Sequence, residues 1–94
     1  MKRSVRIGSY FCFPVDLAAE MSSWPEFISG KGYSVTLTTN SESVSTSFEY
    51  DEEHRYVSVH GEGDGELFLR VLGIVVWALS SASEDVLVTR WSAE

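Results

Sequence analysis

The chain has 94 residues, of which 44% are hydrophobic and 13% aromatic. This is enough apolar material for a single domain over residues 1–94, and it excludes a disordered chain, which would be poorer in aromatic and β-branched residues. The net charge of −7, from 14 acidic and seven basic residues, disfavours direct binding to nucleic acid, because phosphate-binding proteins present basic patches.

Cysteine usage and hydropathy indicate the compartment. Cys12 is the only cysteine, so the disulfides on which small secreted domains rely cannot form within the chain. The N-terminal segment lacks the continuous apolar stretch of a secretory signal. The most apolar run, residues 67–79, contains Arg70 and is shorter than the about 20 residues that cross a bilayer. We therefore expect a cytoplasmic protein with no membrane segment.

The first part of the chain predicts a strand followed by a helix. Apolar and polar residues alternate over residues 4–13, as in a strand, and Pro14 suits the first position of a helix. Apolar residues at helical spacing predict a helix over residues 15–23, which Pro25 should break or kink. Phe27 and Ile28 are expected to add one more helical turn before Gly30-Lys31-Gly32 ends it.

The middle of the chain predicts three strands, over residues 33–39, 43–50 and 55–61. Each alternates apolar residues with serine, threonine or other polar residues, which indicates a sheet with one solvated face. The connections between the three segments are short and polar, so we expect an antiparallel meander.

The last part predicts a loop, a helix and a strand. The Gly-rich residues 61–65 break the strand pattern, and Asp64 is a plausible N-cap for a helix over residues 67–79 that is apolar on nearly every side. Residues 86–91 predict the final strand. The expected fold is α+β with the order β-α-β-β-β-α-β, in which two helices pack on one face of a mainly antiparallel five-stranded sheet.

No pattern of catalytic or metal-ligating residues outweighs a simpler structural interpretation. His60, Glu62 and Asp64 could share one face and bind a divalent metal, but the glycines around them predict a loop and no fourth ligand is evident. The glycine spacing matches neither phosphate-binding motif, and the acidic residues between the glycines would repel a phosphate. We therefore expect no catalytic residues, no metal site and no cofactor, and we expect the protein not to be an enzyme.

The acidic residues are the more informative group. They concentrate in two turns that the predicted meander places at opposite ends, and exposed tyrosines beside them could anchor an interface. The expected partner-binding residues are Glu49, Asp51, Glu52, Glu53, Glu62, Asp64, Glu66, Tyr50 and Tyr56. Such surfaces suit a basic protein partner, because complementary charge raises association rates.

Small acidic chains without disulfides or catalytic motifs are similar in profile to bacterial immunity proteins, antitoxins and phage-encoded inhibitors. This similarity of profile implies an inhibitor that covers a basic surface of a partner such as a nuclease or another nucleic-acid-handling protein. Two alternatives stay open. One is a self-associating module such as a homodimer, because the helix over residues 67–79 carries more apolar surface than one small sheet covers. The other is a metal- or ligand-binding enzyme that uses His60.

Overall fold

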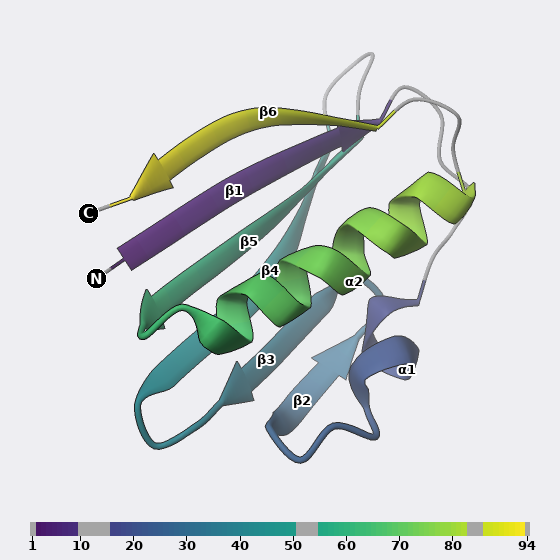
Figure 1. Cartoon of the computed structure of the whole chain (residues 1–94). Coiled ribbons are helices and arrows are strands. Elements are labelled where there is room, and N and C mark those ends of the chain that lie inside the picture. Colours follow the sequence, from purple (N-terminus) through teal and green to yellow (C-terminus); the bar gives the residue numbers. More distant parts are fainter. Residues whose placement is uncertain (1, 10–15, 51–54, 83–85, 94) are drawn as a thin grey trace.

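The computed structural model describes residues 2–9, 16–50, 55–82 and 86–93 of the chain (Figure 1). Within these ranges, six strands form one sheet in the order β2-β3-β4-β5-β1-β6, and every neighbouring pair with a defined register is antiparallel. The elements are β1 (Lys2–Ser9), α1 (Leu17–Met21), β2 (Phe27–Lys31), β3 (Ser34–Thr38), β4 (Glu42–Tyr50), β5 (Arg55–Gly63), α2 (Glu66–Ala82) and β6 (Val86–Ala93).

The two described helices lie on the same face of the sheet (Figure 1). The short helix α1 packs on β2 and β3, while the longer α2 runs across β4, β5, β1 and β6. Alternate residues of the strands point under the helices, and most of these inward residues are apolar. The core consists of Val5, Ile7, Leu17, Ala18, Met21, Val35, Leu37, Val44, Val57, Val59, Leu67, Phe68, Val71, Val75, Ala78 and Leu79.

This arrangement confirms the predicted α+β class, with two helices on one face of an antiparallel sheet. The predicted meander is confirmed as well, because β3, β4 and β5 are successive neighbours in the sheet. The predicted end of the first strand and the predicted start of the first helix fall on residues 10–15, which lie outside the described part of the chain. Neither of the helices within the described ranges has the length and apolar character needed to cross a membrane.

The prediction of an extra helical turn at Phe27 and Ile28 is wrong. Phe27–Lys31 instead forms β2, a sixth strand beside the five predicted. Lys31 pairs with Ser34, so β2 and β3 form a hairpin whose turn holds only Gly32 and Tyr33. Gly32 has φ +61°, the positive φ that hairpin turns of type II′ require at their first central position. The Gly32 carbonyl also accepts a hydrogen bond from the Ala18 N–H at 3.0 Å, which ties the hairpin to α1.

The Gly-rich segment after residue 60 is strand rather than loop up to Gly63. Gly61 continues β5 opposite Val44, and a Cβ at Gly61 would lie 2.6 Å from the Phe68 ring. The glycine in this strand therefore lets α2 approach the sheet closely at Phe68.

A side chain of β4 caps the N-terminus of α2. The Glu42 side chain, only 6% exposed, accepts hydrogen bonds from the backbone N–H groups of Leu67 and Phe68, both at 2.8 Å. The prediction that Asp64 caps this helix is therefore wrong. Gly65 precedes the helix, and its carbonyl accepts the first intrahelical hydrogen bond, from Leu69.

Candidate functional site

The acidic residues expected around the turn after β4 lie only partly within the described chain. Glu49 is exposed on β4 and forms an ion pair with Arg6 of β1. The Arg6 guanidinium also lies 4.2 Å from the centre of the Tyr56 ring, so Tyr56 is half-buried beneath it. Tyr50 ends β4, and Asp51, Glu52 and Glu53 lie outside the described residues. The Glu49 carboxylate is thus already paired with a cation inside the molecule.

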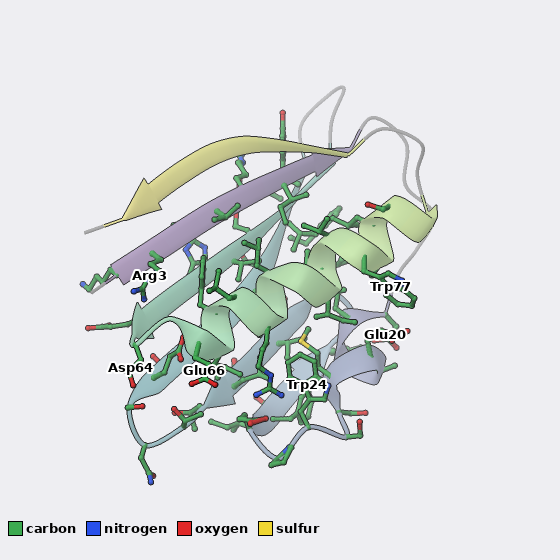
Figure 2. The ribbon with its side chains drawn as sticks, viewed as in Figure 1. Arg3, Glu20, Trp24, Asp64, Glu66 and Trp77 are labelled. Carbon is green, nitrogen blue, oxygen red and sulfur yellow. The ribbon has the colours of Figure 1, made fainter. Side chains whose placement is uncertain are left out.

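The second predicted acidic group is divided between two surfaces. Glu62 is exposed on the sheet face opposite the helices, where Lys2 of β1 is its neighbour in the strand register. Asp64 and Glu66 are exposed at the N-terminal end of α2 (Figure 2). The carbonyl groups of Gly63 and Asp64 accept hydrogen bonds from the Arg3 guanidinium at 2.9 and 3.3 Å. Arg3 therefore holds the turn that leads from β5 to the two exposed acidic residues.

The outer surface of the two helices and of residues 22–26, here called the helix side, exposes large apolar residues. Leu69 is 61% exposed and Trp77 is 56% exposed. Both lie on the solvent-facing side of α2, where exposed positions recur at helical spacing. These positions are Glu66, Leu69, Arg70, Gly73, Trp77 and Ser80. The sequence indicates this surface only through the helix over residues 67–79, which is apolar on nearly every side. Which of its residues are exposed depends on how the helix packs on the sheet.

Carboxylates flank these apolar residues. Glu20 is exposed on α1 and lies with Trp77 toward one end of the helix side, while Glu66 and Asp64 lie at the other end of α2 (Figure 2). The exposed cation on the solvent-facing side of α2, Arg70, is engaged within the molecule. Its guanidinium donates to Glu26 at 3.2 Å and lies 4.7 Å from the centre of the Trp24 ring.

The contact with Arg70 changes the chemistry of Glu26. The hydrogen bond from the Arg70 side chain, assisted by a backbone hydrogen bond, holds the pKa of the Glu26 carboxyl below its ordinary value. Glu26 therefore stays ionised to lower pH than a free glutamate and keeps Arg70 occupied. The remaining carboxylates of the helix side face solvent without such a partner in the described contacts, and they give this surface its negative charge.

The residues considered for metal binding do not form a ligand set. Because β5 extends to Gly63, His60 and Glu62 do lie on the same sheet face, whereas Asp64 lies beyond the strand in the turn. Within the described ranges, no three histidine, cysteine, aspartate or glutamate side chains gather closely enough to hold a metal ion. Comparisons with protein-family models, curated proteins and solved structures found no match for this chain.

Proposed function

We propose that the protein is a small inhibitor-type binding module and that its helix side covers a basic surface of a protein partner. The observation that carries this proposal is the exposure of Leu69 and Trp77 on α2 beside the carboxylates of Glu20 and Glu66. Interfaces concentrate their binding energy in a few such apolar anchors, tryptophan above all, and charged residues at the rim select and steer the partner.

The size of the anchors fits a protein partner. A tryptophan side chain contributes on the order of 150–250 Å² of contact surface, and hot-spot residues of this kind each account for about 2 kcal/mol or more of binding energy. The carboxylates around them favour lysine and arginine side chains on the partner. A partner that normally handles nucleic acid would present such a basic surface, and an acidic module of the immunity-protein or antitoxin type would block it.

The acidic residues predicted from the sequence stay part of this proposal with different weights. Asp64 and Glu66 lie at the edge of the helix side, so we propose them as rim contacts. Glu49 and Tyr56 already interact with Arg6, and Glu62 lies on the opposite face of the sheet, which makes these residues weaker candidates for the same interface. The cytoplasmic location and the role of Tyr50, Asp51, Glu52 and Glu53 stay predictions.

Self-association is the second candidate function, because the same exposed Leu69 and Trp77 could cover one another in two copies. Between them lies Gly73, where an added Cβ would meet nothing within 4 Å, so a second helix could approach closely. Such a pair would also bring together two chains that each carry a net charge of −7, which opposes it at low salt.

Capture and sedimentation separate the two functions. The immobilised protein should retain a basic protein from its source cells at low salt, and the purified pair should form a stoichiometric complex that weakens as salt rises. The double variant Leu69→Ser/Trp77→Ser should lose this complex, while Ile28→Ser, which changes another exposed apolar residue on β2, should keep it. Retention by both variants contradicts the proposed surface, and a dimer in sedimentation of the protein alone favours self-association.

A further inference from the structure

The sheet face that the helices leave uncovered is an ordered array of polar side chains. Strand pairing places Thr36, Ser45, His60 and Ser4 side by side in one row across β3, β4, β5 and β1. Because alternate residues of a strand point to the same face, the next row along the strands also lies on this side. That row consists of Thr38, Ser43, Glu62 and Lys2.

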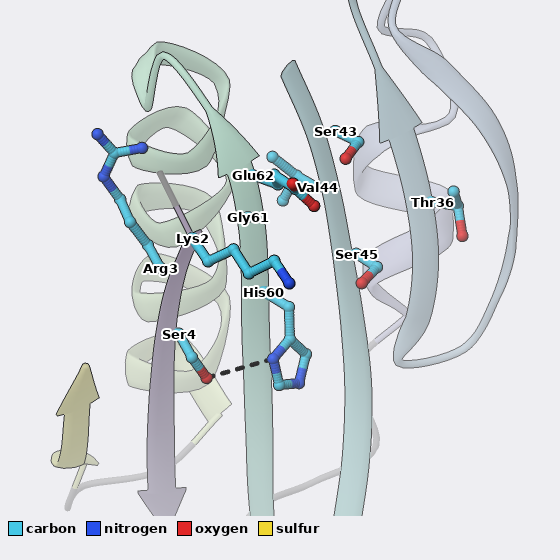
Figure 3. A pocket seen from close by; sticks show the side chains of 10 residues that line it. All are labelled: Lys2, Arg3, Ser4, Thr36, Ser43, Val44, Ser45, His60, Gly61 and Glu62. Carbon is cyan, nitrogen blue, oxygen red and sulfur yellow. Dashed lines mark hydrogen bonds between the residues drawn. The ribbon is translucent and has the colours of Figure 1, made fainter. Parts of the chain in front are cut away.

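A pocket of about 510 Å³ lies over these two rows (Figure 3). Its volume is in the range of about 300–1,000 Å³ that is typical of small-molecule sites. The Lys2 side chain extends from β1 across β5 in the direction of Ser45, and the His60 imidazole lies beneath it (Figure 3). The pocket therefore brings one ammonium, one imidazole and several hydroxyl groups to a single place on the open face.

Several hydrogen-bond donors line this pocket. The Ser4 hydroxyl lies 3.2 Å from Nδ1 of His60. When Ser4 donates to Nδ1, the proton of the neutral imidazole is on Nε2, which becomes a donor, and a protonated imidazole also donates from Nε2. The Lys2 ammonium has donors only, and the hydroxyl groups of Ser43 and Ser45 can donate as well.

We propose that this pocket binds a small ligand through an oxyanion, a carboxylate or a phosphate group, held by Lys2, His60, Ser43 and Ser45. An oxyanion offers acceptors in several directions, which suits a pocket lined by several donors, and the lysine supplies the opposite charge. This inference does not depend on the proposed protein partner, because the pocket lies on the opposite face of the sheet from the helix side.

Glu62 sets the limit on the charge of the ligand. Its carboxylate lies in the same row as Lys2 and on the neighbouring strand, and it lines the same pocket. A polyphosphate or a nucleic acid would bring several negative charges beside Glu62 and would be repelled, whereas the Lys2 ammonium can compensate the charge of a single oxyanion. Glu62 could also accept a hydrogen bond from a hydroxyl or amino group of the same ligand.

NMR titration tests the pocket with defined probes. Sodium phosphate and sodium acetate are added separately to the isotope-labelled protein at constant pH and at an ionic strength kept constant with sodium chloride. We expect saturable shifts of the His60 and Ser45 signals. Saturation by phosphate alone assigns the site to a phosphate group, and saturation by acetate alone assigns it to a carboxylate; saturation by both supports a general oxyanion site.

The two lysines of the chain provide a matched pair of variants. Lys2→Ala should weaken binding at least tenfold, whereas Lys31→Ala, which removes an exposed lysine on β2, should change it less than twofold. His60→Gln should also weaken binding with the spectrum of the folded protein preserved. The absence of saturable shifts with either probe overturns the proposal, and so does an equal response of the Lys2→Ala and Lys31→Ala variants.

Discussion

The Glu42 carboxylate caps helix α2 by accepting a hydrogen bond from the backbone N–H of Phe68 at 2.8 Å. Its other oxygen accepts from the N–H of Leu67 at the same distance, so one buried side chain satisfies two of the free donors at the start of the helix. Glu42 is the first residue of β4, far from α2 in the chain. The cap therefore joins the sheet to the helix that carries the proposed binding surface.

Removal of this cap should destabilise the protein, whereas removal of the Asp64 side chain should not. Glu42→Ala leaves two buried N–H groups without partners, which costs roughly 1–3 kcal/mol of unfolding free energy. Asp64→Ala changes an exposed residue and should stay within about 0.5 kcal/mol. Urea denaturation of both variants measures the difference. An equal loss in the two variants, or a larger loss for Asp64→Ala, would contradict the cap assigned here.

Two glycines of the α2 region should respond oppositely to the same substitution. A Cβ at Gly61 would lie 2.6 Å from the fully buried Phe68 ring, so Gly61→Ala should cost roughly 1–3 kcal/mol through overpacking. Gly73→Ala meets open space on the exposed side of α2 and should stabilise the protein by about 0.5–1 kcal/mol. Thermal unfolding of the two variants decides the matter. Destabilisation by Gly73→Ala would show that the space above it is filled.

Thr46 makes a buried polar connection between β3 and β4. Its hydroxyl accepts from the Val35 N–H at 2.9 Å and donates to the Tyr33 carbonyl at 2.6 Å, and the residue is 5% exposed. Thr46→Val keeps the volume but leaves both backbone groups without this partner, which should cost roughly 1–3 kcal/mol. Thr36→Val on the exposed side of β3 is the control and should have little effect in the same urea titration. A neutral Thr46→Val variant would refute the connection.

Residue patterns predict those parts of the fold that depend on burial alone. The alternation of Val57 and Val59 with polar residues predicted β5 and its buried face, and the two helices followed from their apolar spacing. The strand β2 was not predicted because two apolar residues, Phe27 and Ile28, follow the helical segment closely and resemble one more turn of it. The Gly32-Tyr33 turn was the signal for a hairpin, and its effect depends on pairing with β3.

The candidate surfaces depend on contacts that a linear pattern does not contain. The pairing of Glu49 on β4 with Arg6 on β1 requires β1 to lie beside β5, so that only β5 separates the two residues. This long-range strand order cannot be read from the sequence. The separation of Glu62 from Glu66 follows from the continuation of β5 through Gly63, since a glycine-rich loop was expected there. The exposure of Leu69 and Trp77 likewise depends on which stripe of an all-round apolar helix meets the sheet.

The Glu26–Arg70 pair predicts a pH dependence with a defined sign. Because the pKa of Glu26 is lowered in the folded protein, its contribution to stability is complete above the ordinary glutamate pKa of about 4.3 and is lost as the pH falls through the lowered value. NMR titration of the Glu26 carboxyl should show this low pKa, and Arg70→Met should return it toward the ordinary range. An unchanged Glu26 pKa in Arg70→Met would mean that Arg70 is not the cause.

Photo-crosslinking tests the proposed binding surface most directly. A photoreactive phenylalanine analogue is placed at Leu69 on the helix side or, as the control, at Ser34, which is exposed on the opposite face of β3. After irradiation in the source cells, we predict a single adduct with a basic protein from position 69, lost when Glu20 and Glu66 are changed to lysine, and no such adduct from position 34. The same adduct from position 34 alone, or its persistence at position 69 after the charge reversal, would contradict the account.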